Sequence, residues 1–228
     1  MKFFGFSSDF WLMCISSLLF FMSFNLIILE LPAYLRMLGG DSYQGLIVAL
    51  FTLTAGISSP FSGKLTDKIG RIPIMMFGCF VCAVCGILYP FVLSVSGFLL
   101  LRLFHGLSTG FKPTATVAFV ADIIPADRRG EAMGMIGFFS TLGLSAAPAL
   151  GSFIAAEYGN NVMFYTSSGL SLLSAAIVWR IQESLQIKER FSFKLLQLNK
   201  ADLYDKNVKI VAITMVCTSY YFGAILAL

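Results

Sequence analysis

The chain has 228 residues, of which 57% are hydrophobic and 12% charged, and phenylalanine alone occurs 23 times. Its mean hydropathy of +0.83 is well above that of a water-soluble domain, so the composition indicates a membrane protein. The formal net charge of +4 is small and is not gathered in one cluster. The sequence therefore gives no indication of a nucleic-acid partner.

Six apolar runs are long enough to cross a bilayer as helices, because about 20 mostly apolar residues span the hydrocarbon and only a helix satisfies its own backbone there. They cover residues 10–31, 43–63, 73–92, 97–121, 132–156 and 161–180. The polar stretch 181–207 predicts an amphipathic linker on the membrane surface, and a seventh run begins at 208 and reaches Leu228. We therefore predict an all-α, polytopic membrane protein with a transmembrane bundle over residues 1–180.

Lysine and arginine are distributed unevenly among the connections between these runs. The connections after the second and fourth runs contain Lys64, Lys68, Arg71, Arg128 and Arg129. Those after the first, third and fifth runs contain only Arg36. Because positive residues stay on the cytoplasmic side, the amino terminus and the linker are expected in the cytoplasm. We expect a multi-pass protein of the plasma membrane, which is the inner membrane of a bacterium. The first run is too long for a cleaved signal peptide and lacks a small-x-small cleavage site, so we expect a retained helix.

The stretch "GKLTDKIGR", Gly63 to Arg71, carries four charges and two glycines between two apolar runs. It is expected in a short cytoplasmic loop between the second and third helices. Membrane topology alone requires only Lys and Arg there, and explains neither Asp67 nor the glycines. An acidic residue among cations near helix ends can pair with them and with a helix dipole, and glycine permits a sharp turn. These residues therefore predict a latch that breaks and reforms.

The fourth run carries an unusual set of polar residues. They recur at steps of three and four, which places them on one face of a helix: Arg102, His105, Thr109, Lys112 and Thr116. Charges inside a membrane are costly, so this face is expected to meet a cavity, a partner helix or water. Lys112 is expected in a cavity, as a site for an anionic substrate group or as the partner of a carboxylate. Arg102 could instead snorkel to the interface, and His105 could carry protons or only pack.

The first run contributes Asn25 near its middle and Glu30 near its outer end. Two interpretations of Glu30 stay open. It is either a carboxylate at the membrane interface or a proton-accepting group that pairs with Arg102, because the two helices run antiparallel and place both residues at a similar depth.

Other patterns favour neither a metal site nor an enzyme. Cys79, Cys82 and Cys85 lie in the third run among apolar residues and are expected to be buried. The "GLSTG" stretch, Gly106 to Gly110, matches the serine hydrolase pattern, but the single histidine lies three residues earlier on the same helix, so an intramembrane protease is not favoured. No phosphate-binding loop for ATP is present. We expect no cofactor and no metal.

Four motifs together resemble the major facilitator superfamily of secondary transporters. "GKLTDKIGR" is similar to its signature loop between the second and third helices. "RLFHGLSTG", beginning at Arg102, is similar to its fourth-helix motif, with His105 in the place of the usual glutamine. "PADRRGEA", Pro125 to Ala132, is similar to its loop between helices four and five. The fifth helix has the glycine spacing of the antiporters, with one glycine replaced by alanine: Gly134, Gly143, Ala147, Pro148 and Gly151.

The resemblance implies the amino-terminal six-helix half of such a transporter, built as a 3+3 inverted repeat, followed by the linker (181–207) and the start of a seventh helix (208–228). It implies a conformational latch that stabilises the outward-facing state, with Arg71 and Lys68 as the partners of Asp67: Gly63, Asp67, Lys68, Gly70 and Arg71. It also implies proton coupling through Glu30, Arg102 and His105. The substrate cavity is expected at Asn25, Thr109, Lys112 and Thr116. The antiporter glycines are expected in close helix packing.

The function expected on this resemblance is proton-coupled efflux of a small organic solute by alternating access. Alternating access moves one six-helix half against the other, so a missing carboxy-terminal half or a second copy is expected as a partner, beside substrate, protons and the bilayer. A non-transporting remnant or membrane scaffold is the alternative. A channel, the third possibility, would show uncoupled flux without saturation. Reading the coding sequence beyond Leu228 distinguishes a fragment from a remnant.

Overall fold

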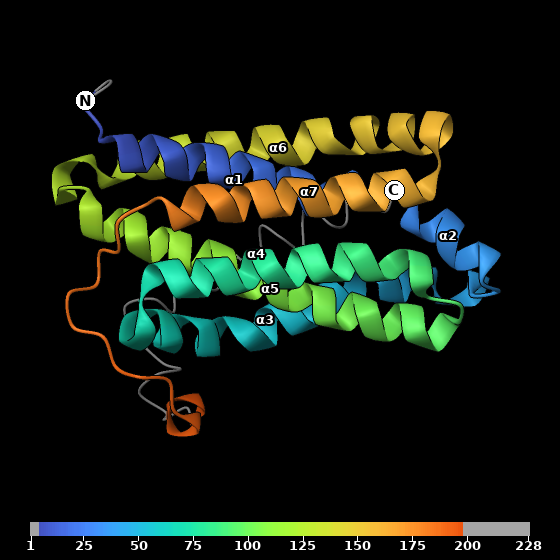
Figure 1. The fold of residues 1–228 in the computed structure, drawn as a ribbon, viewed down its shortest axis with the longest axis horizontal. Coiled ribbons are helices and arrows are strands. Elements are labelled where there is room, and N and C mark those ends of the chain that lie inside the picture. Colours follow the sequence, from blue (N-terminus) through green and yellow to red (C-terminus); the bar gives the residue numbers. More distant parts are fainter. Residues whose placement is uncertain (1–4, 198–228) are drawn as a thin grey trace. The chain divides into compact units, whose positions relative to one another are not determined.

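The structure is a computed structural model that describes residues 5–197, and long antiparallel helices dominate it (Figure 1). The long helices are α1 (Ser8–Leu26), α3 (Gln44–Ile69), α4 (Arg71–Leu88), α5 (Val95–Ile123), α6 (Arg129–Tyr158) and α7 (Asn160–Trp179). The short elements are α2 (Leu31–Met37), η1 (Asp41–Tyr43), η2 (Tyr89–Phe91), η3 (Ala126–Arg128) and η4 (Phe193–Leu196). The predicted all-α fold is confirmed for the described residues.

The chain divides into two compact units, residues 1–191 and 192–228. All the long helices belong to the first unit. The described part of the second unit, residues 192–197, contains η4. The predicted seventh helix at 208–228 and the last part of the predicted linker, residues 198–207, lie outside the described residues.

The helix ends follow local sequence signals. Ser7 and Ser94 cap α1 and α5, because each hydroxyl accepts a hydrogen bond from a first-turn amide. Gly70 and Gly159 each form the whole connection between two long helices, α3 to α4 and α6 to α7, with φ of 134° and 86°. Residues with a side chain rarely adopt such angles, so glycine at these points allows the chain to reverse within one residue.

The first predicted span, 10–31, differs from the structure at its end. Helix α1 stops at Leu26, and a turn leads into α2 at Leu31, with Pro32 in the first turn of α2. Proline is favoured at a helix start and lacks the N–H that a continuous helix would need from it. The hydrophobic run therefore continues through two helices instead of one.

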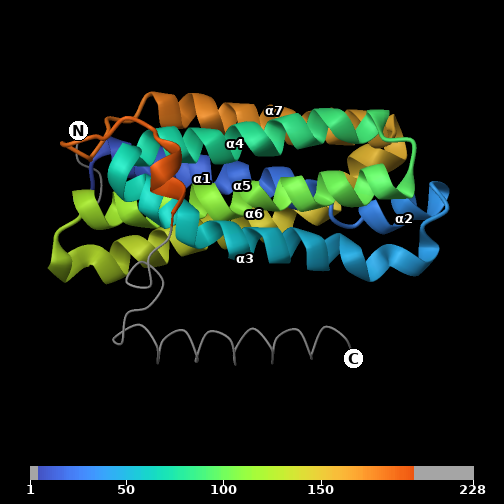
Figure 2. The same cartoon turned by 90° about the horizontal axis from the view of Figure 1, so that it is seen from below.

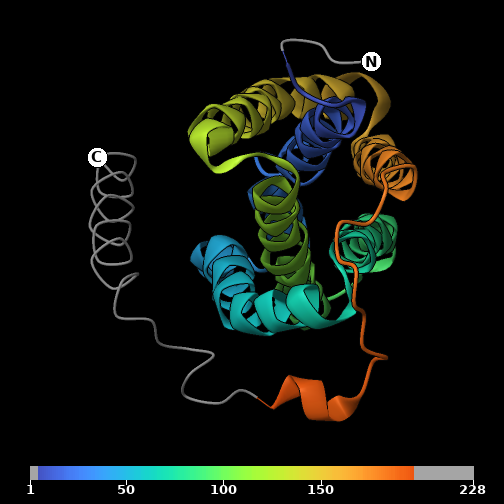
Figure 3. The ribbon, with the colours of Figure 1, turned by 90° about the vertical axis from the view of Figure 1, so that its left-hand side faces the viewer.

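The packing of the unit has an internal two-fold pattern. Helix α1 packs on α6 and α7, and α5 packs in the same way on α3 and α4, while α4 and α7 contact each other. Exchanging the triplet α1, α3, α4 for the triplet α5, α6, α7 leaves this set of neighbours unchanged. Viewed along the helices, α1 and α5 lie between α4 and α7 on one side and α3 and α6 on the other (Figure 3). This arrangement agrees with the predicted 3+3 repeat.

The outer surface of the unit is apolar. Phenylalanine and leucine side chains on α3, α4, α5 and α6 are exposed, among them Leu53, Phe80, Phe104 and Phe138. Five helical stretches among the described residues are long and apolar enough to cross a membrane. The stretches include every long helix except α5, which carries Arg102 and Lys112 among its charged residues. Both of these side chains are buried inside the unit, so the neighbouring helices shelter them from lipid.

Serine hydroxyls join the helices in the interior. Ser167 and Ser174 of α7 donate to backbone carbonyls of α1, at 2.7 and 2.8 Å, and Ser171 donates to the carbonyl of Cys79 on α4 at 2.8 Å. Hydroxyl-to-backbone bonds of this kind are common between membrane helices, where polar groups find no water. Cys79, Cys82 and Cys85 are buried, as predicted.

Candidate functional site

The charged stretch lies mostly in a helix, which corrects the prediction of a loop. Gly63, Asp67 and Lys68 belong to the last turns of α3, Gly70 forms the connection, and Arg71 is the first residue of α4. The single glycine connection makes a longer loop unnecessary. As a result, Asp67 and Arg71 are held on two helix ends that meet at Gly70.

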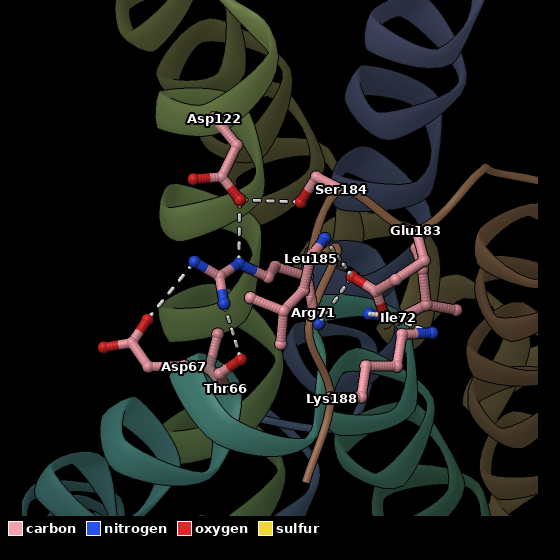
Figure 4. A network of polar contacts seen from close by, with 9 residues as sticks. All are labelled: Thr66, Asp67, Arg71, Ile72, Asp122, Glu183, Ser184, Leu185 and Lys188. Carbon is pink, nitrogen blue, oxygen red and sulfur yellow. Dashed lines mark hydrogen bonds and ion pairs between the residues drawn. The ribbon is translucent and has the colours of Figure 1, made fainter.

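Arg71 is the centre of this site (Figure 4). Its Nε donates to Asp122 Oδ2 at 2.8 Å and one terminal nitrogen donates to the carbonyl of Thr66 at 2.8 Å. The other terminal nitrogen forms an ion pair with Asp67 Oδ1 at 3.3 Å. The planar guanidinium therefore joins α3, α4 and the end of α5 through three directed contacts. We call Asp67, Arg71 and Asp122 the charge latch.

The two carboxylates of the charge latch are not equivalent. The Asp122 side chain is 33% exposed and lies 2.8 Å from Arg71, whereas the Asp67 side chain is 68% exposed and lies 3.3 Å away. Water screens an exposed ion pair, so its contribution is small. Asp122 is therefore the stronger partner of Arg71, although Asp67 is the residue that the sequence motif indicates.

The segment after α7 completes the site. Glu183 accepts hydrogen bonds from the backbone N–H groups of Arg71 and Ile72, at 2.9 and 3.2 Å. The Ser184 hydroxyl donates to Asp122 Oδ2 at 2.7 Å. Lys68, which was expected to pair with Asp67, forms an ion pair with Glu189 at 2.8 Å. This part of the predicted linker therefore packs against α3, α4 and α5.

Sequence reasoning missed three of these acidic partners, Asp122, Glu183 and Glu189. Asp122 carried a usable signal, because it is an acidic residue at the end of an apolar run, as Asp67 is. Glu183 and Glu189 carried none, since they lie in a polar stretch more than one hundred positions from their partners.

The polar face of α5 points toward other helices. Arg102 donates through Nε to the carbonyl of Ile47 on α3 at 2.8 Å, and its guanidinium lies 4.3 Å from the centre of the Phe51 ring. One terminal nitrogen of Arg102 has no hydrogen-bond partner among the described residues. Because Arg102 is buried, snorkelling to the interface does not occur in this structure.

His105 and Lys112 lie deeper in the same interior. The His105 ring is 3.3 Å from Cys82 Sγ and 3.3 Å from the Tyr89 hydroxyl. Lys112 Nζ donates to Ser17 Oγ of α1 at 3.2 Å, and it lies 5.1 Å from the centre of the Phe20 ring. Lys112 is completely buried, so in this conformation it contacts partner helices and does not line an open cavity.

The remaining residues of this predicted set are placed as follows. The Thr116 hydroxyl is buried and donates to the carbonyl of Lys112 at 2.9 Å. Thr109 and Asn25 are partly buried and bond to carbonyls of their own helices. Glu30 accepts a hydrogen bond from Ser152 of α6 at 2.6 Å. Among the described residues, Glu30 and Arg102 form no ion pair with each other, so the structure does not bring together the pair that the sequence suggested.

The antiporter glycines divide into two groups. A Cβ added at Gly143 would lie 2.5 Å from the carbonyl oxygen of Leu18, and one at Gly151 would fall on the carbonyl of Leu26. Ala147 is completely buried, and Pro148 lies within α6 beside it. Gly134, in contrast, has open space around it. Three of the five residues therefore pack closely against neighbouring helices, two of them directly on the α1 backbone.

The described residues contain no group of three side chains suited to hold a metal ion. The geometry that they provide is that of an ion-paired hinge point where helices meet, beside a buried polar interior.

The chain is similar in sequence to known proteins. The family model described as "Major Facilitator Superfamily" matches residues 13–228. Multidrug resistance protein 2 of Bacillus subtilis (strain 168) is 31% identical over 172 residues, which are 75% of this chain and 43% of that protein. Quinolone resistance protein NorA of Staphylococcus aureus is 32% identical over 157 residues, 68% of this chain and 40% of that protein. The chain thus spans less than half the length of these relatives.

Solved structures show the same fold. The crystal structure of the human organic anion transporter MFSD10 (TETRAN) has a TM-score of 0.72 at 21% identity, over 86% of this chain and 52% of that one. The proton:xylose symporter XylE has a TM-score of 0.67 at 17% identity, over 78% of this chain and 45% of that one. The family match over nearly the whole chain shows that this protein belongs to the major facilitator superfamily, whose members are membrane transporters and not enzymes.

Proposed function

We propose that the chain is the amino-terminal half of a proton-coupled antiporter that exports a small organic solute by alternating access. The observation that carries the proposal is the charge latch, in which one nearly buried arginine ties the ends of α3 and α4 to the end of α5. A contact of directed ion pairs at helix ends can break as a unit when one part of the bundle moves, and reform when it returns.

The buried face of α5 supports the coupling to protons. Arg102 and His105 are buried without a carboxylate partner among the described residues, and Glu30 lies in the turn between α1 and α2, beside Ser152. In the proposed cycle, proton entry changes the charge of this interior, and the change favours one orientation of the helices. Solute release follows as the charge latch exchanges between its closed and open forms.

The substrate side of the proposal rests on the relatives. Two of them are named for multidrug or quinolone resistance, which supports a small organic molecule as the solute. Asn25, Thr109, Lys112 and Thr116 remain the proposed substrate residues. Lys112 is buried in the described conformation, so it would reach a solute only after α5 has moved relative to α1.

Transport by alternating access needs a second set of helices opposite these six. The six helices form one half of the architecture that alternating access requires, and α3 and α6 leave apolar side chains such as Leu53 and Phe138 exposed. We propose a carboxy-terminal half, or a second copy of this chain, as the partner on that side. A membrane scaffold without transport activity is the second candidate.

Inside-out vesicles test the proposal directly. The product of the complete reading frame is expressed in a bacterium, and the lumen of the vesicles is acidified. Ethidium and a fluoroquinolone serve as probes. We expect probe accumulation that saturates with concentration and collapses when a protonophore removes the pH gradient.

The Lys112→Ala variant provides the matched comparison in the same vesicles. We expect its transport rate to fall by about tenfold, which corresponds to about 1.4 kcal/mol of activation free energy. Accumulation of the probe that persists without a pH gradient would contradict the proposed coupling of transport to protons. No accumulation of any probe, together with an intact membrane insertion, would favour the scaffold.

A further inference from the structure

The segment that follows α7 crosses the charge latch and contacts both of its sides (Figure 4). We propose that residues 183–189, here called the strap, hold the charge latch closed and have to leave it before it can open, with Glu183 as the positioning residue. The inference rests on the proposed function of the charge latch. It adds a direct connection between the linker and the conformational switch.

Glu183 supplies hydrogen-bond acceptors for the first backbone N–H groups of α4. The first amides of a helix have no partner within the helix, and Gly70 has no side chain with which to cap them. The Glu183 carboxylate accepts from Arg71 N–H at 2.9 Å and Ile72 N–H at 3.2 Å. The next residue, Pro73, has no N–H to satisfy. A negative charge at this position also complements the helix dipole.

Gly70 fits the strap for a second reason besides its backbone angle. A Cβ placed on Gly70 would fall on the Glu183 carboxylate. The absence of a side chain at Gly70 therefore lets Glu183 approach the helix end closely. The Glu183 side chain is only 13% exposed, and Lys188 within the strap lies 3.7 Å from it, which partly balances the charge.

The strap and the charge latch share the same atoms. Asp122 Oδ2 accepts both from Arg71 Nε and from the Ser184 hydroxyl, at 2.8 and 2.7 Å. At the other end of the strap, the Glu189 N–H donates to the carbonyl of Lys68 at 2.7 Å, and the Glu189 carboxylate pairs with the Lys68 ammonium. The strap therefore binds to α3, to the start of α4 and to the end of α5.

This arrangement has a mechanical consequence. When α5 separates from α3 and α4, the strap cannot keep its contacts to all three, because Ser184 would follow Asp122 while Glu189 stays with Lys68. Opening of the charge latch thus requires the strap to detach from at least one helix. Any movement of the linker that lifts the strap would in turn weaken the charge latch.

Cysteine labelling tests the strap without relying on transport. Thr66 is buried directly beneath Arg71, so a Thr66→Cys variant reacts with a maleimide only when the charge latch is open. Labelling is measured in the complete protein in membranes, against the parent without the new cysteine. We expect Glu183→Ala to raise the labelling rate about tenfold and Glu183→Gln, which keeps the shape but not the charge, to raise it a few-fold.

Controls separate the strap from general damage. Gln182→Ala changes an exposed neighbour of Glu183 and is expected to leave the labelling rate as it is. When Asp122→Asn has already opened the charge latch, Glu183→Ala is expected to add little, whereas damage to the bundle elsewhere would add its full effect. If the Glu183→Ala protein does not insert into the membrane, Glu183→Gln and Ser184→Ala are used for the test. For Ser184→Ala we expect the labelling rate to rise about twofold.

The outcomes also distinguish the strap from the proposed function. Unchanged labelling in the Glu183 variants overturns the strap, whatever the transport assays show. Faster labelling in the Glu183 variants of a protein that shows no pH-driven transport would support the role of the strap. The same result would contradict the proposed coupling to protons. Fully additive effects of Glu183→Ala and Asp122→Asn also overturn it, because the strap would then act independently of the charge latch.

Discussion

Arg71 shows why the type of a single residue matters in this protein. A lysine at this position would keep the positive charge, but its single nitrogen could not contact Asp67, Asp122 and the carbonyl of Thr66 from three separate positions, as the three guanidinium nitrogens do. The distances and exposures also rank the two carboxylates. Asp122 accepts a short bond from a nearly buried donor, whereas Asp67 is mostly exposed to solvent.

This ranking gives a prediction at the residue scale. Asp122→Asn should open the charge latch more than Asp67→Asn does, because hydrogen bonds to charged groups contribute about 1.5–3 kcal/mol, while exposed ion pairs are typically worth about 1 kcal/mol or less. The labelling rate of Thr66→Cys measures the difference. Equal rates in the two variants, or a larger rate for Asp67→Asn, would contradict the ranking.

At the scale of the helix, α6 is fixed on α1 by its glycines. The two backbones approach so closely at Gly143 and Gly151 that an added Cβ would meet a carbonyl of α1. A similar contact joins α5 to α3, where Gly106 and Gly110 face the carbonyls of Phe51 and Ala55. Each of the two inner helices thus has at least one neighbour whose backbone approaches it at a glycine, and such close approach is common between membrane helices.

Gly151→Ala and Gly134→Ala form a matched pair that tests this packing. Extra atoms in a tight contact cost about 1–3 kcal/mol, so Gly151→Ala should lower the thermal unfolding temperature of the purified protein. Gly134 has open space around it, and alanine is the better helix former by about 1 kcal/mol, so Gly134→Ala should leave that temperature unchanged or raise it. Equal losses in both variants would show that α6 does not rest on α1 in this way.

At the scale of the whole unit, the antiparallel helices bring several connections of the chain together at one end of the bundle. Helices α3, α5 and α7 end, and α4 and α6 begin, at the end that carries the charge latch and the strap (Figure 2). From the excess of Lys and Arg in these connections, the positive-inside rule predicts that this end lies in the cytoplasm. The orientation follows from the distribution of charge in the sequence and is open to a direct measurement.

Single cysteines measure that orientation. Ser42 and Gln182 are exposed and lie at opposite ends of the helices. A membrane-impermeant maleimide should label Ser42→Cys in intact cells, and it should label Gln182→Cys only after the membrane is permeabilised. The reverse pattern would place the charge latch outside the cell, and the proposed role of the charge latch would have to be abandoned.

Much of the fold was predictable from the sequence because apolar length and charge position are local properties. The long apolar helices and the buried cysteines followed from runs of residues, and the 3+3 repeat followed from the family resemblance that the motifs carry. The break after Leu26 and the helical state of Asp67 did not, since they depend on one proline and one glycine whose effects hydropathy does not register.

The sequence by itself determined that the chain is a polytopic, all-helical membrane protein with a charged cluster that includes Asp67 and Arg71, because burial in lipid requires long apolar helices and makes each remaining charge stand out. Only the tertiary structure decided the partners of those charges. The Arg71 guanidinium binds Asp122, Glu30 binds Ser152, and Lys112 donates to Ser17. Such pairs join residues far apart in the chain, and which of them meet depends on how the helices pack in three dimensions.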